Sequence, residues 1–123
     1  MKILLDTNFI LTCAKQKIDI DTSLNKITTE KIEYLVPQDV LNELGNLKQI
    51  PKHKQAAELS FQILQTLNPK IIQLKTRNPN IDIKIINYII DKPIILATLD
   101  KNLKSRIKNK ILTIRNKKNL ELL

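Results

Sequence analysis

The sequence predicts an α/β protein in which a parallel sheet is flanked by helices. The first observation is a set of short apolar runs, typical of strands buried on both faces, which read ILL at residues 3–5, YLV at 34–36 and IILA at 94–97. The second is that the longer segments between these runs repeat their apolar residues at the helical period. Alternating strands and helices favour a parallel sheet, because parallel strands are joined by crossover connections.

The elements can be placed in order along the chain. Strands are expected at residues 3–5, 34–36, 70–75, 94–97 and 111–114. Helices are expected at residues 8–17, 22–33, 37–45, 52–67, 82–90 and 100–108. Pro37 suits an early position in its helix, and Gly45 marks the end of the same helix. The residues after the last strand are expected to form a basic tail that ends in residues 120–123, which read LELL.

Length and composition indicate one globular domain that spans residues 1–123. Hydrophobic residues make up 42% of the chain, which argues against global disorder. No apolar run is long enough for a membrane span, and we expect no leader segment before the first strand. The single cysteine, Cys13, excludes a disulfide framework and a cysteine-based zinc finger. We therefore expect a cytoplasmic protein without a membrane partner.

The chain is strongly basic, with 21 Lys and Arg against 12 Asp and Glu and a formal charge of +9. This excess indicates a nucleic-acid partner, although a generally basic proteome gives the same number. Aromatic residues make up only 3% of the chain, so recognition of RNA by base stacking is not expected. Binding should act mainly through phosphates. The single glycine excludes Gly-rich phosphate-binding loops.

Two acidic residues follow the two clearest buried strands. Asp6 comes directly after the first strand, and Asp100 comes shortly after the strand at 94–97. Ligands of parallel sheets bind beyond the carboxyl ends of the strands. Both strands are strongly apolar and are expected to be central neighbours, so their terminal carboxylates should lie close together. Thr7 and Thr98 are placed to hydrogen-bond a carboxylate or a water molecule.

Two more acids are expected at the same edge of the sheet. Asp82 opens the helix that follows the third strand, and Glu43 lies in the helix that follows the second. Carboxylates gathered in one place raise one another's pKa and favour a bound cation. Hard oxygen ligands without clustered His or Cys predict Mg²⁺ or Mn²⁺. Such an ion can activate a water molecule for attack on a phosphodiester.

Each of these residues also has a simpler interpretation. Taken singly, Asp6, Asp82 and Asp100 are equally well explained as helix N-caps. Glu43 alone is better explained as a solvated helix residue, and Asp39 as an acid favoured in the first turn of a helix. A basic run beside Asp100 is either a solvated helix face or an RNA-facing surface, with neither interpretation preferred; it consists of Lys101, Lys104, Arg106, Lys108 and Lys110.

Four blocks of the sequence together resemble the PIN-domain ribonuclease family. They are LLDTN at residues 4–8, VPQDVLNEL at 36–44, the helix opened by Asp82, and ATLDKNL at 97–103. The resemblance covers nearly the whole chain and implies a PIN-like three-layer α/β/α sandwich with a central parallel sheet. It is closer to archaeal relatives of the rRNA-processing PIN endonucleases of the small-subunit processome than to VapC-type toxins.

The resemblance assigns roles to individual residues of this chain. It implies that the catalytic and metal-binding acids, which would hold Mg²⁺ or Mn²⁺, are Asp6, Glu43, Asp82 and Asp100. Supporting roles around these acids fall to Asn8, Thr98 and Asn102. We expect the RNA-binding residues to be Lys101, Lys104, Arg106 and Lys108.

The chain departs from the family pattern at two positions. The family usually shows two adjacent acids where Asp82 stands, and here its neighbours are Ile81 and Ile83. A further Asp is frequent in the family where this chain has Asn102. Fewer carboxylates imply weaker binding of a second metal ion.

The leading hypothesis is a metal-dependent endoribonuclease that cleaves precursor rRNA during ribosome maturation with a metal-activated water. One alternative is a VapC-type toxin ribonuclease. Another is a degenerate PIN domain that binds RNA or an assembly partner without cleaving. The resemblance also allows for a homodimer, with residues 120–123 as one contact, or for a ribosome-assembly partner.

Overall fold

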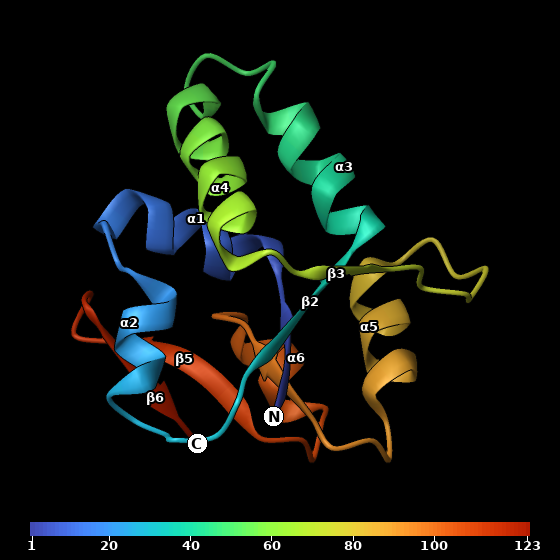
Figure 1. Cartoon of the computed structure of the whole chain (residues 1–123). Coiled ribbons are helices and arrows are strands. Elements are labelled where there is room, and N and C mark those ends of the chain that lie inside the picture. Colours follow the sequence, from blue (N-terminus) through green and yellow to red (C-terminus); the bar gives the residue numbers. More distant parts are fainter.

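Six strands form the central sheet of the protein, whose computed structural model describes residues 1–123 (Figure 1). They are β1 (Lys2–Leu5), β2 (Glu33–Pro37), β3 (Lys70–Ile72), β4 (Ile94–Ala97), β5 (Ile111–Arg115) and β6 (Asn119–Leu122). Their order in the sheet is β3-β2-β1-β4-β5-β6. All neighbouring pairs are parallel except β5 and β6, which are antiparallel. The expected neighbourhood of the first strand and the strand at 94–97 is therefore confirmed.

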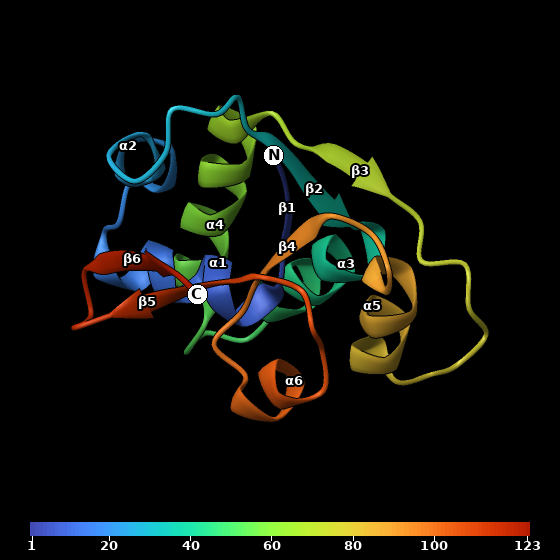
Figure 2. The same cartoon turned by 90° about the horizontal axis from the view of Figure 1, so that it is seen from below.

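Helices cover both faces of this sheet. They are α1 (Thr7–Gln16), α2 (Ile20–Asn25), α3 (Gln38–Leu47), α4 (Lys54–Leu67), α5 (Ile81–Ile89) and α6 (Lys101–Ser105). The large buried hydrophobic residues of α1 to α4 belong to one hydrophobic cluster, and those of α5 and α6 belong to a second. Seen from below, the strands run between α2 and α4 on one side and α5 and α6 on the other (Figure 2). The α/β/α sandwich expected from the sequence is confirmed.

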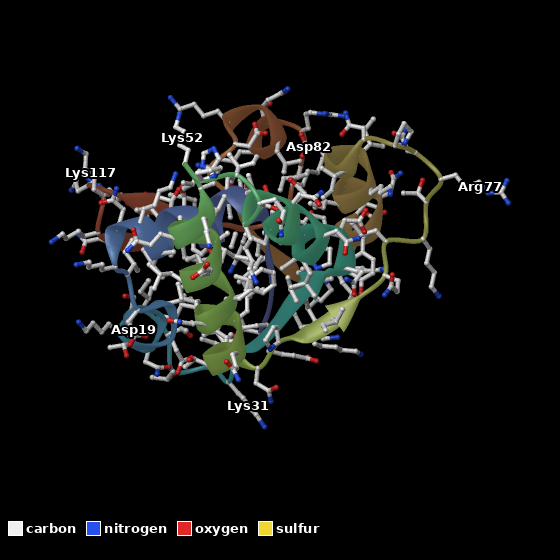
Figure 3. All side chains as sticks on the ribbon, turned by 90° about the horizontal axis from the view of Figure 1, so that it is seen from above. Asp19, Lys31, Lys52, Arg77, Asp82 and Lys117 are labelled. Carbon is white, nitrogen blue, oxygen red and sulfur yellow. The ribbon has the colours of Figure 1, made fainter.

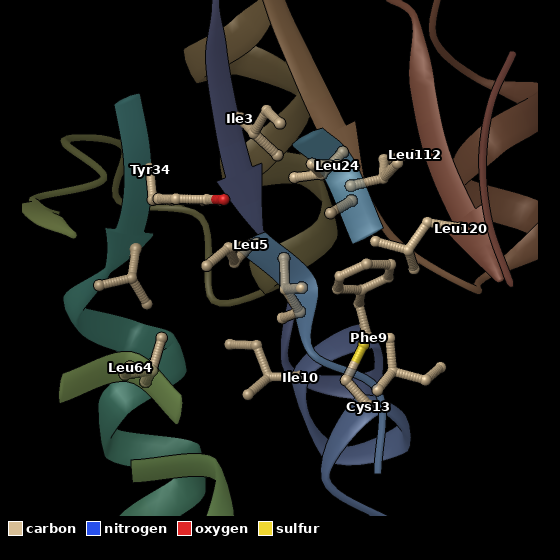
Figure 4. Close-up of a cluster of buried hydrophobic side chains, with 14 of the residues drawn as sticks. Ile3, Leu5, Phe9, Ile10, Cys13, Leu24, Tyr34, Leu64, Leu112 and Leu120 are labelled. Carbon is tan, nitrogen blue, oxygen red and sulfur yellow. The ribbon is translucent and has the colours of Figure 1, made fainter. Parts of the chain in front are cut away.

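The central strands supply both cores by alternation of their side chains. In β1, Ile3 and Leu5 face the cluster beneath α1 to α4, and Leu4 faces the cluster beneath α5 and α6. This alternation explains the continuous apolar runs in the sequence, because a strand buried on both faces has no polar face. Figure 4 shows the larger cluster, in which Phe9 and Cys13 of α1 pack under the sheet.

The order in which the chain adds strands to the sheet changes direction at β1. From β1 the chain proceeds outward to β2 and β3, and it then returns to place β4 on the other side of β1. Such a reversal separates the connections that leave the two strands and opens a crevice at their carboxyl ends. The residues that follow β1 and β4 therefore lie where an α/β sheet binds its ligands.

Two helices are shorter than the sequence predicts. The helix expected at 22–33 ends at Asn25, and Ile27, within the expected range, is 43% exposed. The cause is the strand that follows, because Glu33 pairs with Lys2 and residues 26–32 must extend to reach the sheet. The helix expected at 100–108 ends at Ser105. Beyond it, the Asn109 side-chain amide donates to three backbone carbonyls, those of Ile89, Lys92 and Ile94.

The ends of strands β2 and β3 also differ from those that the sequence predicts. Pro37 is the last residue of β2 and precedes the first turn of α3, where the sequence predicts it within the helix. The strand expected at 70–75 pairs only through Ile72. β3 is an edge strand with one neighbour, β2, which itself ends at Pro37 opposite Ile72, so no partner remains for later residues.

The last residues of the chain form a strand, where the sequence predicts a basic tail. β5 and β6 are joined by a tight turn in which Asn116 and Lys117 both adopt left-handed backbone angles, with φ of 53° and 66°. The connection has three residues, 116–118, and two successive left-handed residues allow the chain to reverse tightly between antiparallel strands. Leu120 of β6 is only 8% exposed and belongs to the larger core. Part of the apolar end of the chain is therefore used within its own fold.

No helix of the structure combines the length and the apolar character needed to cross a membrane.

Replacing Leu120 with alanine should destabilise the protein by about 2–4 kcal/mol, because the change leaves a cavity in the core. Leu123→Ala is the matched control, since Leu123 is 61% exposed and its loss should change the free energy of unfolding by less than about 0.5 kcal/mol. Urea unfolding of both variants measures the difference. Equal stabilities would show that β6 does not contribute to the core.

Candidate active site

Asp6 lies at the carboxyl end of the central strand β1. Its backbone N–H donates to the carbonyl of Ala97 at 3.0 Å, which continues the pairing of β1 with β4 by one residue. Its side chain is 6% exposed and caps α1, with Oδ1 accepting from the Thr7 N–H at 2.9 Å. The second oxygen, Oδ2, accepts from the Thr98 hydroxyl at 2.8 Å. Asp6 is thus an N-cap whose carboxylate is also held from the neighbouring strand.

Thr98 connects the residues that follow the two central strands. Its hydroxyl has one hydrogen, and the 2.8 Å distance to Asp6 makes that carboxylate its acceptor. The hydroxyl oxygen accepts from the Asp100 N–H at 3.2 Å. The Asn8 side-chain oxygen accepts from the Leu99 N–H at 3.1 Å. Side chains from residues 6–8 therefore hold the segment that leads from β4 to Asp100.

Asp100 caps the short helix α6. Its Oδ1 accepts from the backbone N–H groups of Asn102 and Leu103, at 2.9 and 3.2 Å. Leu103 is 1% exposed and anchors α6 to the smaller core. These hydrogen bonds use one carboxylate oxygen and fix the orientation of the group. The backbone N–H of Asn102 takes part in this cap, while its side chain is exposed.

Asp82 lies in the first turn of α5 without capping it (Figure 3). Asn80 is the cap, and its side-chain oxygen accepts from the N–H groups of Asp82 and Ile83 at 2.9 and 3.3 Å. The Asp82 carboxylate is therefore not used as the N-cap. Burial raises the pKa of Asp82, the Asp100 carboxylate raises it further, and the nearby Arg106 guanidinium lowers it.

Glu43 projects from α3 toward the same group of acids. Burial raises its pKa, the Thr7 hydroxyl lowers it, and the carboxylates of Asp6, Asp82 and Asp39 raise it. Glu43 Oε1 and Thr7 Oγ1 are both buried, and neither has a hydrogen-bond partner of standard geometry. A buried carboxylate oxygen without a hydrogen-bond partner lowers the stability of the fold, and a bound cation or hydrogen-bond donor would remove this penalty.

Comparison with known protein families identifies the family of this domain. The family described as PIN-like domain matches residues 3–117 of the chain. The chain belongs to the PIN-like domain family. The family resemblance of the four sequence blocks is thereby confirmed.

Individual relatives agree with this assignment. Ribonuclease VapC4 from Methanocaldococcus jannaschii is 27% identical over 127 residues, covering 98% of this chain and 95% of that protein. The solved structure of the PIN domain endonuclease Utp24 matches with a TM-score of 0.76 and 25% identity, covering 99% of this chain and 92% of that one. VapBC2 from Rickettsia felis, solved with a DNA fragment from its promoter, has a TM-score of 0.68 and 16% identity, covering 94% and 100%.

In this PIN-like domain, the four sequence-predicted acids come from four separate segments and influence one another electrostatically. Burial raises the pKa of Asp6, the hydrogen bonds from Thr98 and Thr7 lower it, and the carboxylates of Asp82 and Asp100 raise it. The repulsion between these groups means that the folded protein keeps negative charge together at a cost. No three acidic, His or Cys side chains converge closely enough to form a ready-made metal-ligand set.

The donor groups nevertheless fit a divalent cation in their chemistry. All of them are carboxylate oxygens, which are the ligands that Mg²⁺ and Mn²⁺ prefer. A cation would offset the repulsion that raises the pKa of Asp6, Glu43 and Asp82. It would also give the buried Glu43 Oε1 the partner that it lacks.

The basic residues expected to bind RNA do not all face solvent in the same way. Lys101, Arg106 and Lys108 are exposed. Lys104 is partly buried, and its Nζ donates to the Thr113 hydroxyl of β5 at 2.8 Å. Lys104 is therefore bonded to the sheet, whereas the side chains of Lys101, Arg106 and Lys108 are accessible to solvent.

Two features near the acids were not apparent in the sequence. Asn80 caps α5, and the signal that could have revealed it is its position two residues before Asp82, since Asn is a favoured N-cap. Lys84 of α5 donates to Asp39 of α3 at 3.1 Å. No local signal predicts this pair, because the two residues are 45 positions apart.

Thr98→Val should lower the free energy of unfolding by about 1–3 kcal/mol, because the buried Asp6 carboxylate loses a hydrogen bond. Thr98→Ser keeps the hydroxyl and should cost less than Thr98→Val. Urea unfolding of both variants at neutral pH tests this order. A valine variant as stable as the serine variant would contradict the role given to the hydroxyl.

Asp6→Asn should stabilise the metal-free protein at pH 7 by about 1 kcal/mol, or about 3–5 °C in Tm. Asn is also a favoured N-cap, so the variant mainly removes the buried charge. A raised pKa means that the folded state binds the proton more tightly than the unfolded state, so this penalty is present at neutral pH.

The pH dependence of this difference provides the control. The advantage of Asp6→Asn should shrink as the pH falls through the raised pKa toward the ordinary value of 3.8, since Asp6 itself becomes neutral. Thermal unfolding of both proteins in a chelating buffer between pH 7 and pH 4 measures it. A difference that grows as the pH falls would contradict the sign of the pKa shift.

Proposed function

We propose that this protein is a divalent-metal-dependent endoribonuclease whose metal ligands are Asp6, Glu43, Asp82 and Asp100. The observation that carries the proposal is the place where these acids gather in a PIN-like fold. Asp6 and Asp100 follow the two strands between which the sheet reverses its order. The Asp82 carboxylate helps to raise the pKa of both Asp6 and Glu43, which supports its place in this group of acids. Mg²⁺ and Mn²⁺ are the ions that we propose.

The chain's own residues would prepare the site for hydrolysis of a phosphodiester. A divalent ion held by the carboxylates would supply a water of lowered pKa and neutralise charge on the phosphate. Thr98 and the Thr7 N–H hold the Asp6 carboxylate, and the N–H groups of α6 hold that of Asp100. Because these carboxylates are already oriented, less ordering is required when the ion and the substrate bind.

RNA is the proposed substrate because of charge and of the shape of the site. The chain carries a formal charge of +9, and Lys101, Arg106 and Lys108 lie exposed just after Asp100. The five main surface pockets, with volumes of about 190 to 870 Å³, contain none of the four acids. An acidic site outside any deep pocket suits a polymer better than a small ligand.

Precursor rRNA is the RNA class that we propose first, and we propose a cytoplasmic site of action. The support is the resemblance of the sequence blocks to rRNA-processing PIN endonucleases, together with the likeness to the endonuclease Utp24 over 99% of this chain. A toxin ribonuclease is the second candidate, and the identity of 27% with ribonuclease VapC4 favours it. An assembly partner would accompany the first role, and an antitoxin would accompany the second.

The test is cleavage of a small-subunit precursor rRNA, a tRNA pool and an mRNA, with Mn²⁺ or Mg²⁺ and with a chelator. The native chain should cleave the precursor with metal only, and Asp6→Asn should lower the rate by about 100-fold or more. Glu58→Gln is the matched control, because Glu58 is an exposed acid on α4 outside the group of acids. It should cleave like the native chain.

The possible results separate the candidates. Cleavage of tRNA or mRNA with the precursor left intact would favour the toxin role. Equal cleavage by the native chain and Asp6→Asn would exclude the proposed site. RNA binding that weakens with salt, without cleavage under any condition, would favour a PIN domain that binds RNA only.

A further inference from the structure

One ion pair joins the two helices that carry Glu43 and Asp82. Lys84 Nζ of α5 lies 3.1 Å from Asp39 Oδ2 of α3. In Figure 1 the first turn of α5 lies just below that of α3, in agreement with this contact. This contact is the only side-chain hydrogen bond between the two helices.

The pair matters because α3 and α5 pack into different cores. Val40 and Leu44 anchor α3 in the cluster on one face of the sheet, whereas Ile85 and Ile89 anchor α5 in the cluster on the other face. Ile81, partly buried at the start of α5, touches both clusters. The Lys84–Asp39 pair is the polar side-chain contact that joins the first turn of α5 to α3.

The pair lies directly beside the proposed metal ligands. Asp39 precedes Glu43 by four residues on α3, so the two side chains share a face of that helix. The repulsion of Asp39 on Glu43 agrees with this placement. Lys84 follows Asp82 by two residues in the first turns of α5. A movement of α5 relative to α3 would therefore change the separation of Glu43 and Asp82.

The surroundings of the pair make it stronger than an ordinary surface ion pair. The Lys84 and Asp39 side chains are only 20% and 28% exposed. The other ion pair of the protein, between Arg115 and Glu121, is 70% and 31% exposed. Water and salt screen charges less when the charges are partly buried, so the Lys84–Asp39 pair holds its geometry better.

We propose that Lys84 and Asp39 are positioning residues that set the separation of Glu43 and Asp82 for metal binding. The proposal rests on the proposed function, because it concerns the same group of acids. Neither residue is a metal ligand in this proposal. The pair acts through the placement of α5 against α3.

A purely electrostatic effect of the two residues can be distinguished by its sign. Lys84→Met removes a positive charge near the acids, and by charge alone it should strengthen cation binding. Asp39→Asn removes a negative charge, and by charge alone it should weaken cation binding. If the pair acts by position, both variants weaken binding, and the exchanged pair Lys84→Asp with Asp39→Lys restores it.

The first measurement uses the metal-free protein and does not depend on catalysis. Native-state hydrogen exchange should show the amides of residues 84–87 in α5 exchanging about two- to tenfold faster in Lys84→Met than in the native chain. Amides in α4 should be unchanged, and Lys84→Arg should stay close to the native chain. Unchanged exchange in α5 of Lys84→Met would overturn the proposal, whether or not the protein is a nuclease.

The second measurement is Mn²⁺ binding followed by calorimetry. Lys84→Met and Asp39→Asn should each weaken binding about two- to tenfold. The exchanged pair should recover most of this loss. Opposite changes in the two single variants would show a charge effect alone and would overturn the positioning role.

The two measurements also keep this proposal apart from the proposed function. A native chain that neither binds Mn²⁺ nor cleaves RNA would disprove the metal-dependent nuclease and with it the positioning of metal ligands, while the exchange data would still report whether the pair holds α5. If the native chain binds Mn²⁺ and cleaves RNA, and Lys84→Met binds and cleaves equally well, the positioning role alone is disproved. In an active protein, Lys84→Met should lower kcat more than it raises KM, whereas a direct contact of Lys84 with RNA would mainly raise KM.

Discussion

The parallel pairing of β1 with β4 is the constraint on which the site depends. Leu5 lies opposite Ala97, and the backbone of Asp6 continues the ladder by bonding to Ala97. This register brings the residues after the two strands together, so that the Thr98 hydroxyl reaches the Asp6 carboxylate at 2.8 Å. A slip of one residue would turn these side chains to the opposite face. The arrangement of polar groups at this edge therefore follows from the register of two apolar strands.

The site combines elements from both helical layers, and this combination has an energetic consequence. Asp6 and Glu43 come from the side of α1 and α3, while Asp82 and Asp100 come from the side of α5 and α6. Burial and mutual repulsion raise the pKa of three of these carboxyl groups. The fold thus retains unfavourable charge where a cation would relieve it, as is typical of sites that exchange some stability for function.

The lysine and arginine side chains near this edge differ in the contacts that they make. Lys84 is paired with Asp39, Lys104 is bonded to Thr113, and Arg106 is near enough to lower the pKa of Asp82. Some lysines and arginines that look equivalent in a list of charges therefore have structural partners. The cations that remain exposed, among them Lys101 and Lys108, are those available to phosphates.

The sequence by itself determined strands β1 to β5, the presence of helices between them and the position of Asp6 after β1, because apolar periodicity reports burial locally. The four acids could be named from their positions after strands and from the family resemblance. Only the tertiary structure decided that the last residues form β6 and that Lys84 pairs with Asp39. The end of α2 likewise depended on the pairing of Glu33 with Lys2. These features rest on contacts between residues that are distant in the sequence, and the local pattern of a sequence does not record such contacts.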